Sequence, residues 1–164
     1  MQKVDRMLIA ILAGVVGLVL IAFAILLLRP KAAYLPDGTP DAAVHNYLLA
    51  LQLADESRAY SYVSPAAKGY PYTLADFQRS IRMASYAFDS LKTATFAVGP
   101  ATVSGDTASV LVTQANLNSG NLFGSSGNST TITFRLRRNP TNGAWKIVTA
   151  DSLWAYCWDF NTGC

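Results

Sequence analysis

The chain contains few residues that could carry out acid–base, nucleophilic or metal chemistry. It has one histidine, His45, and the acids near its later strands are Asp89, Asp106, Asp151 and Asp159. A general base must be held against a reacting group, most often with its pKa shifted by burial. Asp106 falls in a predicted turn, the other acids fall at strand ends or in the tail, and no acid can be paired with His45. The sequence therefore predicts a protein that is not an enzyme.

The sequence also predicts no metal or cofactor. Two cysteines, Cys157 and Cys164, together with one histidine do not supply the four ligands of a closed zinc site. The chain has no Cys-x-x-Cys-His motif for covalent haem and no Gly-rich phosphate loop before a helix. The two cysteines lie close together in the tail, so they are a candidate disulfide in an oxidising compartment.

One short basic cluster is present, Arg135-Leu136-Arg137-Arg138. In a strand, Arg135 and Arg137 share one face. The favoured interpretation is a solvated strand end, and the alternative is an anion site. From Lys31 onward the chain has ten basic and nine acidic residues, a net charge of +1. This near-balance predicts no nucleic-acid partner.

Two apolar features outside the regular elements are candidate partner contacts. Trp154, Tyr156, Trp158 and Phe160 recur at spacing two, so in an extended tail they would point the same way. They would either cover one end of the sheet or line the cone, or they would contact a partner or the membrane interface. The polar stretch 118–129 carries Leu122 and Phe123 at its centre, and it is either a mobile hairpin tip or a docking loop.

The first thirty residues predict a retained membrane anchor. Met7–Leu28 is an uncharged apolar stretch of 22 residues, roughly 33 Å of helix. It exceeds the apolar region of a signal peptide and ends without an A-x-A-like cleavage site. Basic residues flank both of its ends. The short N-terminal tail and the candidate disulfide favour a cytoplasmic N-terminus, with the C-terminal domain outside the cytoplasm.

After a linker over 31–40, the chain reads as helices first and strands afterwards. Thr39 and Pro40 begin a helix predicted over 40–55, a break at 55–57 starts a short second helix, and Thr73 with Asp76 resembles a capping box for a third. From residue 86, segments rich in Thr, Val and aromatics alternate with turns at 104–106 and 139–143. This order predicts an α+β domain over 41–152 with an antiparallel sheet of four to five strands, followed by the tail 153–164.

The segments AVHNYLLALQLADESRAYSYVSPAAK and GAWKIV resemble the nuclear transport factor 2-like superfamily of cystatin-like folds, especially its bacterial membrane-anchored members. The resemblance covers about residues 38–152. It implies a bent sheet wrapped around the first helix, with a cavity between them. Functions within this superfamily are diverse, and some members are isomerases or dehydratases. The candidate cavity-lining residues are Tyr47, Leu51, Phe77, Phe96, Phe134 and Trp145.

Together these features predict a single-pass protein of the cell membrane with a cone-shaped extracytoplasmic domain. The predicted function is a non-catalytic binding or assembly module, with an accessory subunit of a larger membrane complex as one form of it. The alternative is a small apolar ligand bound in the cone cavity, and an isomerase- or dehydratase-like enzyme ranks third. The expected partners are the membrane and other membrane-protein subunits, and a small-molecule ligand is left open.

Overall fold

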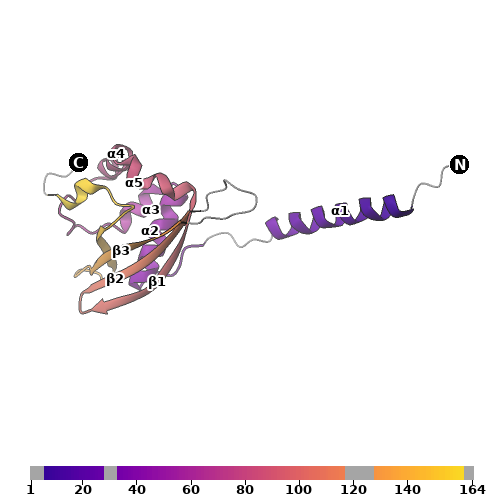
Figure 1. The fold of residues 1–164 in the computed structure, drawn as a ribbon. Coiled ribbons are helices and arrows are strands. Elements are labelled where there is room, and N and C mark those ends of the chain that lie inside the picture. Colours follow the sequence, from indigo (N-terminus) through magenta and orange to yellow (C-terminus); the bar gives the residue numbers. More distant parts are fainter. Residues whose placement is uncertain (1–5, 28–32, 117–127, 161–164) are drawn as a thin grey trace. The chain divides into compact units, whose positions relative to one another are not determined.

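The computed structural model describes residues 6–27, 33–116 and 128–160 (Figure 1). The chain divides into two compact units, Met1–Ala33 and Tyr34–Cys164. The first unit contains one helix, α1 (Arg6–Leu27), at the position of the predicted anchor. Among the described residues, no helix combines the length and the hydropathy needed to cross a membrane.

The second unit begins with two helices joined by a sharp corner. Helix α2 (Pro40–Gln52) starts at Thr39, whose hydroxyl accepts a hydrogen bond from the amide of Ala42, and has Pro40 in its first turn. It ends three residues before the predicted end. Ala54 then adopts a left-handed conformation with φ of 55°, and Asp55 caps α3 (Glu56–Ser61) through the Arg58 amide. The predicted break is therefore a corner with an N-cap.

Further helices lead into the sheet. Helix α4 (Leu74–Met83) begins at the predicted cap, where Thr73 accepts a hydrogen bond from the Asp76 amide at 3.1 Å. A short helix α5 (Ser85–Phe88) and a 3₁₀ turn η1 (Asp89–Lys92) follow directly. The strand-forming part of the chain, expected from residue 86, thus begins later, at Ala94, because residues 85–92 continue the helical turns.

The sheet has four strands in the order β1-β2-β3-β4, each antiparallel to its neighbour. The strands are β1 (Ala94–Ser104), β2 (Thr107–Asn116), β3 (Asn128–Arg138) and β4 (Trp145–Ala150). β1 continues through Gly99-Pro100 with a register shift between Val98 and Ala101, so this pair does not end the strand. This confirms the α+β class and the antiparallel sheet.

One core holds the helices against the sheet. Helix α2 lies along one face of the sheet (Figure 1), and its buried side chains include Val44, Tyr47 and Leu48. Inward-facing residues of the strands meet them, among them Val110 and Phe134, which are fully buried. The chain then continues past β4 into the C-terminal 3₁₀ turn η2 (Tyr156–Asp159), which joins the same core.

Candidate functional site

The acids and the histidine that could have served catalysis lie at separate positions. Asp89, Asp106 and Asp151 are exposed. Asp151 lies 3.6 Å from the guanidinium of Arg135 and accepts a hydrogen bond from the Thr133 amide at 3.1 Å. His45 is half-buried on α2. No group of three or more His, Cys, Asp or Glu side chains among the described residues is placed to hold a metal ion.

Five of the six residues predicted to line a cavity are core residues. Tyr47, Phe77 and Phe134 are fully buried, and Leu51 and Trp145 nearly so, whereas Phe96 is partly buried at the edge of the core. The rings of Tyr47 and Phe134 meet edge-on with centroids 6.2 Å apart. The Tyr47 hydroxyl donates to the carbonyl of Leu153 at 2.9 Å. All six belong to one hydrophobic core or pack against it, and of the six only Trp145 lines one of the three hollows described below.

The C-terminal tail does not have the extended conformation in which its four aromatic side chains would point the same way. Residues 156–159 form the turn η2, so the four aromatic side chains do not share one face. Trp154 and Trp158 are buried, with indole rings edge to face at 4.7 Å. Tyr156 and Phe160 are 57% and 58% exposed, with ring centroids 6.5 Å apart. The tail therefore buries Trp154 and Trp158 in the core and exposes Tyr156 and Phe160 at the surface. Leu122 and Phe123 lie outside the described residues.

Several contacts hold the C-terminal turn in place. The Trp154 indole donates to the Asp159 carboxylate at 3.2 Å, and the Gly69 amide donates to the Trp158 carbonyl at 2.8 Å. A Cβ at Gly69 would lie 2.0 Å from the Cys157 carbonyl oxygen, so only glycine permits this approach. Cys157 is disulfide-bonded, while its predicted partner Cys164 lies outside the described residues.

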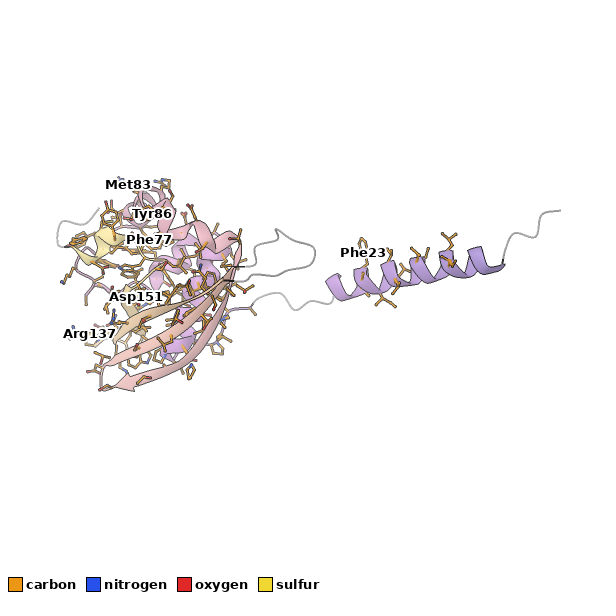
Figure 2. The ribbon with its side chains drawn as sticks, in the orientation of Figure 1. Phe23, Phe77, Met83, Tyr86, Arg137 and Asp151 are labelled. Atoms are coloured by element: carbon orange, nitrogen blue, oxygen red, sulfur yellow. The ribbon has the colours of Figure 1, made fainter. Side chains whose placement is uncertain are left out.

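Five large apolar side chains are exposed on the segments that surround this turn. The indole of Trp158 joins these segments: its ring stacks on Phe77 of α4 at 5.1 Å and contacts Phe88 of α5 at 6.4 Å. Figure 2 places Met83 and Tyr86 at this end of the domain, near Phe77. We call the exposed set the aromatic rim; it consists of Tyr72 (87% exposed), Met83 (64%), Tyr86 (66%), Tyr156 and Phe160.

A polar cluster fastens the start of the second unit. Asn46, fully buried on α2, accepts from the Leu35 amide and donates to the Leu35 carbonyl, both at 2.8 Å, and donates to Asp37 at 3.0 Å. The hydroxyl of Tyr62 also donates to Asp37, at 2.8 Å. Lys146 bonds the Ser61 carbonyl. This part of the predicted linker is thus held against α2, α3 and β4.

Burial governs the pKa values in this cluster. Burial raises the pKa of Tyr62 above its ordinary value, and the hydrogen bond to Asp37 adds to the shift. Burial lowers the pKa of Lys146, and attraction to Asp37 opposes that change. The adjoining hollow is only about 110 Å³. Because its polar groups are already paired with each other, the cluster is suited to holding the chain rather than a ligand.

Two larger hollows adjoin each other at the end of the sheet that carries the β1–β2 and β3–β4 turns. One is about 630 Å³ and is lined by 64–66, Asp106 and 137–141. The other is about 510 Å³ and is lined by residues of β1, β2 and β3 that include Ser104, Ser109 and Arg135. Both are lined by Ala66 and Arg137. We call the pair the arginine hollow.

Sequence reasoning identified parts of these surfaces and missed others. The arginine run and the pair Tyr156 and Phe160 had been singled out. Tyr72, Met83 and Tyr86 were missed because they belong to different segments and the three share no sequence pattern. Met83 and Tyr86 did carry a sequence signal, because they are two large apolar residues on either side of Ala84 and Ser85. That is the point at which α4 ends and α5 begins.

Comparison with known proteins finds neither a protein-family model nor a curated protein that matches this sequence. Similar solved structures include a SEC-C motif protein from Rhodopseudomonas palustris (13% identity, 80% of this chain and 88% of that one, TM-score 0.45). A ketosteroid isomerase candidate from Shewanella frigidimarina shows 22% identity over 70% and 94%, with a TM-score of 0.49. A nuclear transport factor 2-like protein with a cystatin-like fold from Novosphingobium aromaticivorans shows 19% identity over 71% and 83%, with a TM-score of 0.41. No activity is drawn from these likenesses.

Proposed function

We propose that this protein is a non-catalytic binding or assembly module of nuclear transport factor 2-like fold. In this proposal an apolar N-terminal helix anchors it in the cell membrane, and the domain over 34–164 lies outside the cytoplasm. Its partner is another membrane-protein subunit, which docks on the aromatic rim. The anchor rests on the uncharged run Met7–Leu28, whose length matches a bilayer core.

The aromatic rim is the observation that carries the proposal. Single exposed apolar side chains are ordinary on protein surfaces and need no explanation. Here Met83 ends α4, Tyr86 lies on α5, and Tyr72 lies in the bend just before α4. Tyr156 and Phe160 lie in η2 and directly after it. The buried ring of Trp158 contacts Phe77 of α4 and Phe88 of α5. Four of the five are aromatic, and aromatic residues and Met are enriched where partners bind.

The rim is also built rigidly. The Trp154–Trp158 pair, the disulfide at Cys157 and the close approach of Gly69 restrain the backbone between Tyr156 and Phe160. A surface ordered before binding loses less conformational entropy on association. A non-catalytic role is further supported by the exposed and separate positions of Asp89, Asp106 and Asp151, because a general base must be held against the group from which it takes a proton.

Purification of the full chain in a mild detergent, with quantitative mass spectrometry of what accompanies it, tests this proposal. We expect at least one membrane protein in a fixed ratio to the chain. The double variant Tyr156→Ser/Phe160→Ser should lose it by about tenfold or more, since residues at the centre of an interface each contribute over about 1 kcal/mol.

The matched control is Val103→Ser/Leu111→Ser, because these sheet residues are also about half exposed, at 51% and 55%. It should keep the partner. Recovery of the chain alone, or equal loss in both double variants, would contradict a docking role for the rim.

A further inference from the structure

The arginine hollow has the chemistry of an anion site. Arg137 and Arg138 line its larger part and Arg135 and Arg137 its smaller part. One acidic residue, Asp106, lines the larger part, and none lines the smaller part. Arg137 is exposed and forms no ion pair within the part of the chain that the structure describes. Figure 2 shows it at the end of the sheet away from Met83 and Tyr86, so this surface is separate from the aromatic rim.

Neighbouring strands place hydroxyl groups beside the guanidinium groups. Thr107 pairs with Arg137 across the β2–β3 ladder, and Ser109 pairs with Arg135. On the other side of β2, Ser104 pairs with Thr107 and Thr102 with Ser109. Directly paired residues of antiparallel strands share one face of a sheet. Two guanidiniums and four hydroxyls are therefore presented together.

Most of these donors are available to a ligand. The Thr107 hydroxyl donates to the Ser104 carbonyl at 2.9 Å. No hydrogen bond joins the hydroxyls of Thr102, Ser104 or Ser109 to another described residue. Arg135 is shared with Asp151, but at 3.6 Å, with both side chains half exposed or more, that pair is weak.

Arg138 has a different role in the hollow. Its guanidinium lies over the Trp145 ring, 4.9 Å from the centroid, and its backbone amide donates to the Asp106 carbonyl at 2.8 Å. The ring supports the side chain while leaving its in-plane N–H groups able to donate. The bond from the Arg138 amide to the Asp106 carbonyl continues the β2–β3 pairing by one residue beyond Thr107 and Arg137.

We propose that the arginine hollow binds a phosphate ester. The guanidinium group presents paired donors that match phosphate oxygens, and hydroxyls supply donors for further oxygens. The two adjoining volumes are each of the size found for small-molecule sites. A soluble phosphate ester and a lipid phosphate headgroup have this same chemistry, and the experiment separates the two sources.

The experiment follows the arginine Nε–Hε resonances of the full chain in dodecyl maltoside micelles. One titration adds glycerol 1-phosphate, and a second adds phosphatidylglycerol to the micelles. We expect saturable shifts at Arg135 and Arg137. Arg137→Gln should raise Kd about tenfold or more, because a charge-assisted hydrogen bond contributes about 1.5–3 kcal/mol. Arg137→Lys keeps the positive charge but lacks the paired N–H donors of the guanidinium, so it should weaken binding less than Arg137→Gln does.

Arg82→Gln is the matched control, since Arg82 is an exposed arginine on α4, and it should change Kd by less than about twofold. Saturation by glycerol 1-phosphate supports a soluble ligand. Saturation by phosphatidylglycerol alone, with the same dependence on Arg137, supports a lipid headgroup. Absence of saturation in both titrations, or equal weakening by Arg82→Gln and Arg137→Gln, would overturn the proposal.

Discussion

Individual residues in this domain show how a few buried polar groups set its conformation. Tyr47 and Asn46 are neighbours on α2, and both are fully buried. Each satisfies its polar atoms on a distant segment, Tyr47 on the Leu153 carbonyl and Asn46 on Leu35 and Asp37. Buried polar groups left without partners are costly, so these two side chains specify where the ends of the domain attach.

Tyr47→Phe should lower the free energy of unfolding at neutral pH by about 1 kcal/mol, through loss of one hydrogen bond. The difference in free energy of unfolding between the wild type and this variant should become smaller at alkaline pH. Burial raises the pKa of Tyr47 in the folded state, so above about pH 10 only the unfolded state releases that proton and stability falls as pH rises. The variant has no hydroxyl to ionise at this position. Its free energy of unfolding should therefore fall less steeply with pH than that of the wild type, by up to about 1.4 kcal/mol per pH unit.

Urea unfolding at neutral pH and above about pH 10 measures both effects. Tyr72→Phe is the control, because Tyr72 is 87% exposed. A wild-type slope in Tyr47→Phe would show that Tyr47 is not protected from ionisation by burial.

Asn46→Ala should lower the free energy of unfolding by about 1–3 kcal/mol, because it leaves the Leu35 amide and carbonyl without their partner. Gln52→Ala removes an exposed carboxamide from the same helix, whose contacts are longer, at 3.3 and 3.4 Å. It should change stability much less. Equal losses in the two variants, measured by urea unfolding, would mean that the segment 34–37 is not held by Asn46.

At the scale of elements, the sequence predicted those features that depend only on residues close together in the chain, such as the starts of helices. Thr39, Asp55 and Thr73 cap the helices predicted to begin beside them, because a cap depends only on the next three residues. The tail could not be predicted in this way. Spacing two suggested an extended strand, but Trp158 is held by Phe77 and Phe88, residues far earlier in the chain.

The candidate sites likewise contain some residues that are close together in the sequence and others that only the fold brings together. The arginine run was visible because its members adjoin in sequence, whereas the hydroxyls opposite it depend on the register of β2. Five of the six residues expected to line a cavity are buried in the core instead, because their burial depends on side-chain packing that no sequence pattern encodes.

The corner between α2 and α3 gives a prediction at this scale. Ala54 is exposed and has a φ of 55°, a conformation that disfavours any residue with a Cβ by about 1–2 kcal/mol. Ala54→Gly should therefore raise the free energy of unfolding, by up to about 1 kcal/mol after the added unfolded-state entropy is counted.

Ala54→Val should have the opposite effect, because a β-branched residue tolerates this conformation least. The two variants differ only at one exposed site, so thermal unfolding compares them directly. If Gly destabilised the protein and Val did not, the corner would not have the left-handed geometry described here.

At the scale of the whole molecule, the second unit presents two separate surfaces on one rigid core. The aromatic rim surrounds the C-terminal turn, and the arginine hollow lies at the end of the sheet that carries the β1–β2 and β3–β4 turns. The proposed module would use the rim for a protein partner and the hollow for a phosphate ester. The two roles can be tested separately, because the substitutions at each surface are exposed and do not touch the core.

Site-specific photo-crosslinking in intact cells tests the central claim most directly. Benzoylphenylalanine replaces Tyr156 or Phe160 in the full chain, with Leu111 as a control position that is equally exposed, at 55%. The account predicts one discrete cross-linked membrane protein from both rim positions and none from the control. The same product from Leu111, or no product from either rim position, would contradict it.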